Sequence, residues 1–136
     1  MKVIVDTDVW SEAFRKKKGK KSLYRHELEH LVQETRVQMI GPIRMEILCG
    51  LRDTKLFEII ESSLRAFPDR FLESEVYVLA ARFFNLCRSK GIQGSNTDFV
   101  ICACSVLWRS PILSKDKDYQ HYKKLLPIEL IHPRKG

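Results

Sequence analysis

Six carboxylates in this chain have the type and spacing for metal chemistry. Each lies at the end of a strand-like run or in the first turns of a helix-like run: Asp6, Asp8, Glu46, Asp98, Asp116 and Asp118. Like charges brought within about 4 to 6 Å disfavour each other's ionisation, and a divalent cation removes that cost. Oxygen ligands favour Mg²⁺ or Mn²⁺ over zinc. Together these acids predict a magnesium or manganese site, although each alone also fits an ordinary cap, turn or solvated helix position.

The elements that must position these acids alternate along the chain. Short β-branched runs at 2–5, 37–40, 112–114 and 128–131 predict strands. Amphipathic or apolar runs predict helices at 7–14, 22–34, 41–49, 54–66, 73–90, 98–108 and 118–126. Because no hairpin signal joins the strands, we expect an α/β fold with a mainly parallel sheet. Ligands bind such a sheet beyond the carboxyl ends of its strands, where Asp6 and Asp116 both fall.

Length and composition limit the class of protein. The chain has 136 residues, 44% of them hydrophobic and 30% charged, which is typical of one globular domain. The longest nearly apolar run, 99–108, is about half the length of a membrane helix. Asp6 interrupts what would be the apolar core of a signal peptide, and the four cysteines form no CxxC pair. We therefore expect a cytoplasmic protein with no membrane association and with reduced thiols.

The charge is basic and uneven. The chain has 24 Lys and Arg against 17 Asp and Glu, a net charge of +7, which favours polyanionic partners. Six cations fall in one run of seven residues: Arg15, Lys16, Lys17, Lys18, Lys20 and Lys21. This basic segment could contact phosphates or an acidic partner, or it could be a solvated loop, and the sequence does not separate these alternatives.

One further motif matches metal chemistry of a different kind. Residues 26–30 read HELEH, the H-E-x-x-H pattern of zinc proteases. The apolar stripe of that helix, Tyr24, Leu28, Leu31 and Val32, lies opposite the two histidines. We therefore interpret the motif as a solvated helix face.

Four short motifs in order resemble a known family. They are VIVDTDVW from residue 3, MEILCG from residue 45, TDFVICA from residue 97 and LSKDKDY from residue 113. Their order and spacing are similar to those of PIN-domain ribonucleases, in particular the VapC toxins of bacterial toxin–antitoxin pairs. The resemblance covers essentially the whole chain.

The resemblance implies a fold, an activity and a set of partners. The fold is a single PIN domain over 1–136, three-layered α/β/α, with a central parallel sheet of about five strands. The activity is that of a Mg²⁺- or Mn²⁺-dependent endoribonuclease toxin, which leaves a 5′-phosphate and a 3′-hydroxyl. The partners are an RNA substrate, held in part by the basic segment, and a cognate VapB-type antitoxin. A homodimer is also implied, with a candidate surface on the helices at 54–66 and 73–90.

The resemblance also assigns the site residues. The catalytic quartet is Asp6, Glu46, Asp98 and Asp116. Asp6, Asp98 and Asp116 are the metal ligands, with Asp8, Glu46 and Asp118 as further candidates, and the supporting hydroxyls are Thr7, Thr97 and Ser114. Asp8 departs from the family, which has Asn or Ser at this position, and adds a negative charge beside the metal site.

Two other functions remain open at this stage. A haloacid dehalogenase-like phosphatase would use Asp6 as nucleophile and Asp8 as acid and base, but that assignment leaves Glu46 without a role. A catalytically inactive PIN domain would only bind RNA or a partner protein. An aspartyl-phosphate intermediate distinguishes the phosphatase, and retained cleavage distinguishes the nuclease from the inactive domain.

Overall fold

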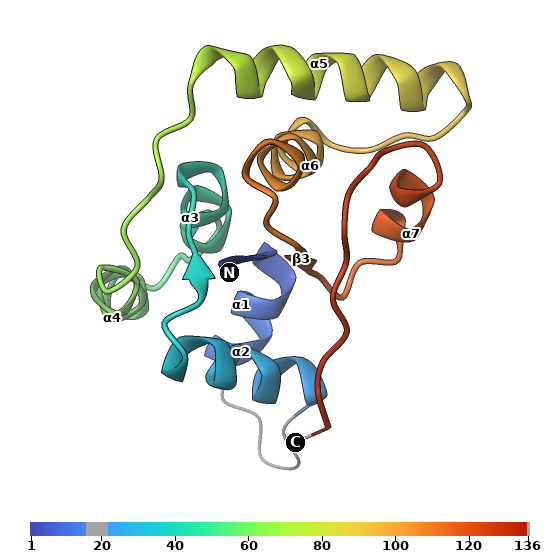
Figure 1. Ribbon diagram of the computed structural model, residues 1–136. Helices are drawn as coiled ribbons and strands as arrows, with labels where there is room; N and C mark the ends of the chain where they lie inside the picture. Colours follow the sequence, from blue (N-terminus) through green and yellow to red (C-terminus); the bar gives the residue numbers. More distant parts are fainter. Residues whose placement is uncertain (16–21, 136) are drawn as a thin grey trace.

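A computed structural model of the chain describes residues 1–15 and 22–135 (Figure 1). In chain order the elements are β1 (Val3–Val5), α1 (Thr7–Phe14), α2 (Leu23–Gln33), β2 (Val37–Gln38), α3 (Gly41–Leu48), α4 (Thr54–Leu64), α5 (Ser74–Ser89), α6 (Asn96–Trp108), β3 (Ile112–Leu113) and α7 (Asp118–Lys123). The alternation predicted from the sequence is confirmed, with element ends that differ by a few residues.

The sheet is parallel, with β1 in its centre. The strand order is β2-β1-β3, and Ile4 pairs with both Gln38 and Ile112. About five strands were expected, and three form. Two further segments each add one parallel bridge, Asp69 beside β2 and Leu130 beside β3. Pro68 and Pro127 precede these outer segments, and proline lacks the N–H that a longer ladder needs.

Helices surround this small sheet in the α/β class predicted. Figure 1 shows α6 and the long α5 stacked on one side of the strands, and α2 on the other. Helix α6 is apolar nearly all round, and every residue from Phe99 to Ser105 is buried, as its composition predicts. Because α6 is fixed in the core, it gives Asp98, the acid in its first turn, a rigid backbone.

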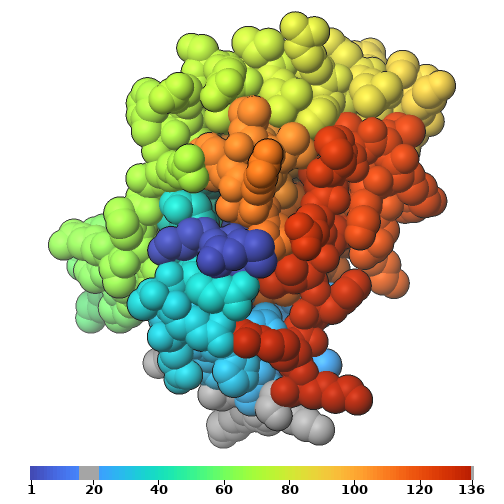
Figure 2. Space-filling model, viewed as in Figure 1, coloured from blue at the N-terminus to red at the C-terminus, as the bar shows by residue number. Residues whose placement is uncertain are grey.

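Two helices keep apolar side chains on the surface. On α4, Ile59 is 63% exposed, and on α5, Val78 is 53% exposed, while Phe71 between these helices is 80% exposed. Figure 2 shows α4 and α5 along the left and upper margins of the molecule. Two aromatic residues of this region do not belong to the surface: Phe83 is buried, and Phe67 packs edge-on against Trp10 in the core.

Candidate active site

Asp6 connects the first strand to the first helix. It follows β1 directly and caps α1, because its Oδ1 accepts a hydrogen bond of 2.8 Å from the main-chain N–H of Thr7. The other oxygen, Oδ2, accepts one of 2.7 Å from the Ser114 hydroxyl. A helix cap was one of the ordinary positions that the sequence left open for this acid. The carboxylate of Asp6 performs the capping itself, which fixes its orientation at the edge of the sheet.

The loop after β3 is tied to the same edge. The Ser114 hydroxyl, which donates to Asp6, also accepts a hydrogen bond of 3.0 Å from the main-chain N–H of Asp116. The carboxylate of Asp116 in turn accepts one of 2.9 Å from the N–H of Asp118. One serine hydroxyl therefore links the two acids that follow neighbouring strands.

Asp8 holds this loop against α1. Both of its carboxylate oxygens accept from the main-chain N–H of Lys115, at 3.2 and 3.3 Å. The ammonium group of Lys115 forms an ion pair with Glu12 on the next turn of α1. The acid that departs from the family pattern therefore carries a structural contact here.

Glu46 reaches the site from α3. Its Oε1 accepts a hydrogen bond of 2.7 Å from the hydroxyl of Thr7 at the start of α1. Thr7 was predicted as a supporting hydroxyl, and it contacts one of the predicted acids. The bond spans two elements that are far apart in the sequence.

Asp98 lies in the first turn of α6, where Ser95 caps the helix by accepting from its main-chain N–H at 3.1 Å. The Oδ2 atom of Asp98 accepts a hydrogen bond of 2.7 Å from the hydroxyl of Tyr122. The Oδ1 atom of Asp98 lies 3.5 Å from the hydroxyl of Tyr119. Both tyrosines belong to α7 and are buried. The sequence analysis missed Tyr122. The sequence signal that could have identified it is its place in a short helix close to the acids of the last motif. A buried tyrosine needs a hydrogen-bond partner for its hydroxyl, and a nearby acid can provide one.

The electrostatics indicate that these acids form one group. Burial, with repulsion from Asp8 and then Asp98, raises the pKa of Asp6 to about 7. Burial also raises the pKa of Asp98, with repulsion from Asp116 and Glu46, while the hydrogen bond from Tyr122 opposes the rise. Each of the four predicted catalytic acids is therefore within electrostatic range of another.

The donor chemistry of this group fits a hard divalent cation. Carboxylate and hydroxyl oxygens are the groups that Mg²⁺ and Mn²⁺ select, and mutual repulsion is the cost that such an ion relieves. Within the described ranges, no group of three or more His, Cys, Asp or Glu stands close enough to hold a metal as the side chains lie. Three of these carboxylates each accept a hydrogen bond from a neighbouring hydroxyl, which leaves further lone pairs on each carboxylate for a cation.

The remaining predicted residues have different outcomes. Asp118 opens α7 on the surface beside Asp116, and Thr97 is half-buried in the first turn of α6. Their roles stay predictions. Arg15 is exposed and bonds to the carbonyl of Ser11. The other five cations of the basic segment, Lys16, Lys17, Lys18, Lys20 and Lys21, lie outside the described residues.

The H-E-x-x-H segment has a structural explanation. Glu27 is buried on α2, and its carboxylate accepts hydrogen bonds from Arg134, 2.6 Å from the main-chain N–H and 2.7 Å from Nη2. A metal-binding motif would need that glutamate free beside the two histidines. The solvated-face interpretation is therefore wrong for Glu27, which is buried, while His26 and His30 are half-buried. It is also wrong for Val32, which was placed in the apolar stripe but is exposed.

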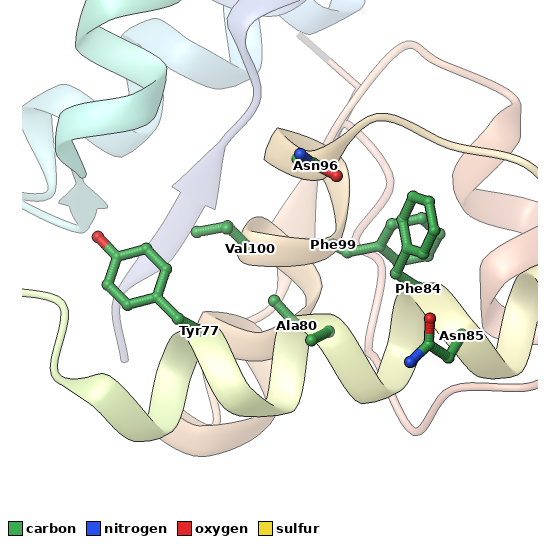
Figure 3. Close-up of a pocket in the computed structure, with 8 residues that line it drawn as sticks. Tyr77, Ala80, Phe84, Asn85, Asn96, Phe99 and Val100 are labelled. Atoms are coloured by element: carbon green, nitrogen blue, oxygen red, sulfur yellow. The ribbon is translucent and has the colours of Figure 1, made fainter.

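A cavity opens between α5 and α6. It has a volume of about 310 Å³, and its walls are mainly apolar. Figure 3 shows Tyr77, Ala80 and Phe84 from α5 facing Phe99 and Val100 from α6, with Asn96 at one end. Its lining carries no carboxylate, so it is separate from the site described above.

The fold is an α/β domain with a group of acids at one edge of a parallel sheet, and known proteins resemble it over nearly its whole length. No family model matches the chain. A VapC ribonuclease of Mycobacterium bovis is 27% identical over 131 residues, which is 93% of this chain and 96% of the relative. Ribonuclease VapC11 of Mycobacterium tuberculosis matches with the same values. The resemblance stated from the sequence is confirmed: the chain is similar to VapC ribonucleases over nearly its whole length.

Solved structures share the fold. FitAcB from Neisseria gonorrhoeae has a TM-score of 0.75 at 18% identity, covering 96% of this chain and 97% of that one. VapBC2 from Rickettsia felis, solved with a DNA fragment from its promoter, has a TM-score of 0.76 at 14% identity, covering 96% and 98%. The expected fold class is therefore confirmed, although the sheet of the described residues has fewer strands than expected.

Proposed function

We propose that this protein is the toxin of a toxin–antitoxin pair, an endoribonuclease that cleaves RNA in the cytoplasm with Mg²⁺ or Mn²⁺. A cognate antitoxin of the VapB type neutralises it. The observation that carries the proposal is that Asp6, Glu46, Asp98 and Asp116, from four separate parts of the chain, lie close enough for their charges to interact. Hydroxyl groups hold three of them in place. The similarity to VapC ribonucleases over nearly the whole chain supports it.

Each acid has a role that follows from its surroundings. Asp6, Asp98 and Asp116 hold the cation, with Glu46 beside them. When bound, the cation polarises the scissile phosphate and lowers the pKa of a water. One of the two less buried acids, Asp98 or Asp116, would orient the attacking water and accept its proton. Ser114 and Thr7 fix Asp6 and Glu46 through their hydroxyls.

The antitoxin partner has support from the neighbouring structures. The matched Rickettsia felis structure is a VapBC2 assembly, and a matched structure from Klebsiella pneumoniae is a toxin–antitoxin complex. That second structure has a TM-score of 0.67 at 13% identity.

In the described part of this chain, none of the helices is long and apolar enough to cross a membrane.

The test is cleavage of total cellular RNA by purified protein, with the ends of the products mapped. With Mg²⁺ or Mn²⁺ we expect discrete fragments that carry 5′-phosphates, and no cleavage in EDTA. Asp6→Asn and Asp116→Asn remove one negative charge each and should lower cleavage at least a hundredfold. Asp53→Asn is the matched control, because Asp53 is exposed and caps α4 instead; it should cleave like wild type.

Three outcomes contradict the proposal. If both site variants still cleave RNA, the activity comes from another site or from a contaminating nuclease. An absence of cleavage in folded, partner-free protein favours the inactive binding domain. An aspartyl-phosphate on Asp6 favours the phosphatase, although the relatives reported above are ribonucleases.

A further inference from the structure

Two tyrosines of α7 face the carboxylate of Asp98. The hydroxyl of Tyr122 donates to Oδ2 at 2.7 Å, and that of Tyr119 lies 3.5 Å from Oδ1. We propose that Tyr122 is a positioning residue, which holds Asp98 in the orientation that cation binding needs. This inference rests on the proposed function.

Tyr122 is itself held rigidly. Its side chain is fully buried, and its ring packs 5.0 Å from the ring of Phe99 and 5.2 Å from that of Tyr119. Phe99 follows Asp98 in α6, so the same helix provides the acid and the wall against which Tyr122 packs. The hydroxyl therefore has little freedom to leave the carboxylate.

Gly94 leaves the space that the hydroxyl occupies. A Cβ atom at this position would overlap the Tyr122 hydroxyl and lie 2.8 Å from Cζ and 3.0 Å from Cε2 of Phe99. Gly50 and Gly91 have positive φ, but Gly94 does not, so its backbone tolerates other residues. A glycine is needed here for volume, and the volume serves Tyr122.

The hydrogen bond has a use because Asp98 lies among like charges. Asp116 and Glu46 repel its carboxylate, and this repulsion favours an orientation in which the carboxylate turns away from the other acids. The hydrogen bond from Tyr122 fixes the position of Oδ2, and each carboxylate oxygen keeps a lone pair for a cation. Partners that hydrogen-bond a metal ligand in this way are worth about 10- to 100-fold in affinity or activity.

The experiment measures Mn²⁺ binding to partner-free protein without RNA, from the electron paramagnetic resonance signal of free Mn²⁺. Tyr122→Phe removes only the hydroxyl and should weaken binding about tenfold. Tyr119→Phe, at the longer distance, should change it less than twofold. Tyr77→Phe is the control, since Tyr77 is exposed on α5. Gly94→Ala displaces the hydroxyl and should reproduce the defect of Tyr122→Phe.

A double-mutant cycle separates positioning from a general structural effect. If Tyr122 acts through Asp98, then Tyr122→Phe in the Asp98→Asn background should cause no further loss. Wild-type affinity in Tyr122→Phe, or a full additive loss in the double variant, overturns the inference and leaves the proposed function standing. If wild type binds no Mn²⁺ at millimolar concentration, the metal dependence of the proposed function fails, and the inference fails with it.

Discussion

At the scale of single residues, one pattern organises the site. Three acids each accept a hydrogen bond of 2.7 Å from a hydroxyl on a different element: Glu46 from Thr7, Asp6 from Ser114 and Asp98 from Tyr122. Each hydroxyl fixes a carboxylate that repulsion would otherwise drive outward. The geometry of the site therefore depends on neutral side chains as much as on acids.

Ser114 gives the sharpest prediction at this scale. Ser114→Ala removes the donor to Asp6 and the acceptor for the N–H of Asp116, so both acids lose their fixed positions. We expect the rate of RNA cleavage at limiting Mg²⁺ to fall about tenfold. Ser114→Thr keeps the hydroxyl and should stay near wild type. Equal rates in the alanine and threonine variants would show that the hydroxyl has no such role.

The acids were predictable from sequence, but their hydroxyl partners were predictable only in part. Asp6 and Asp116 follow apolar runs, and the ends of parallel strands meet at one edge of the sheet. Thr7 and Ser114 adjoin these acids in the chain, which made them visible. Tyr122 is 24 residues from Asp98, and the contact forms only because α7 packs against the start of α6. Periodicity within one segment carries no information about such packing.

At the scale of elements, the C-terminal segment is fastened to α2. Burial of Glu27 opposes its ionisation, but hydrogen bonds from Arg134 outweigh that effect and lower the pKa of Glu27. The guanidinium also reaches Glu34, with Nη1 at 2.8 Å from Oε2. One arginine therefore holds Glu27 in the middle of α2 and Glu34 at its C-terminal end, and it lies at least 100 positions later in the chain.

The pH dependence of stability follows from this contact. Because the folded pKa of Glu27 lies below its unfolded value, the pair stabilises the fold above that unfolded value, and the contribution is lost as pH falls through the folded pKa. Arg134→Ala should lower the melting temperature by several degrees at pH 7, and the difference from wild type should narrow toward pH 3. Thermal unfolding followed by circular dichroism at each pH measures this difference in melting temperature.

A control variant completes that test. Lys135→Ala, next in the chain, should melt like wild type throughout. A difference between Arg134→Ala and wild type that stays constant from pH 7 to pH 3 would contradict a role for Glu27 ionisation.

The helices were more predictable than the sheet for a physical reason. A helix such as α6 forms its hydrogen bonds within one segment, so composition and caps in that segment predict it. A strand needs a neighbour. The run at 128–131 is apolar enough for a strand, yet it forms one bridge, at Leu130. The resemblance gave the fold class, and only the structure gave the length of each ladder.

At the scale of the whole molecule, the positive charge predicts how RNA binds. The net charge is +7, and the basic segment holds six cations in seven residues. Replacing Lys16, Lys17 and Lys18 by serine in an Asp6→Asn background should weaken binding. It should also lower the slope of log affinity against log salt by about 2, since each contact with single-stranded nucleic acid contributes about 0.7. Fluorescence anisotropy of a labelled RNA at several salt concentrations measures both the affinity and this slope.

The matched control changes the same charge elsewhere. Arg82, Arg88 and Lys90 are exposed on or next to α5, and their replacement by serine should leave the salt slope unchanged. If both triple variants lose the same slope, net charge alone explains the binding. The basic segment then has no special role.

The expected homodimer belongs to the same scale. Ile59, Phe71 and Val78 expose more than half of their side chains over α4, α5 and the segment between them. Ile59→Glu with Val78→Glu should convert a dimer into a monomer in light-scattering measurements, while Val32→Glu on α2 should not. A wild-type protein that is monomeric at micromolar concentration would contradict the expectation.

The central claim is that one divalent cation site is formed by acids from β1, α3, α6 and the loop after β3. The most direct test is anomalous diffraction at the manganese edge from crystals soaked in Mn²⁺. We predict a peak bounded by the carboxylates of Asp6, Asp98 and Asp116. A peak beside His26 and His30 on α2, or no peak near Asp6 at saturating Mn²⁺, would contradict the account.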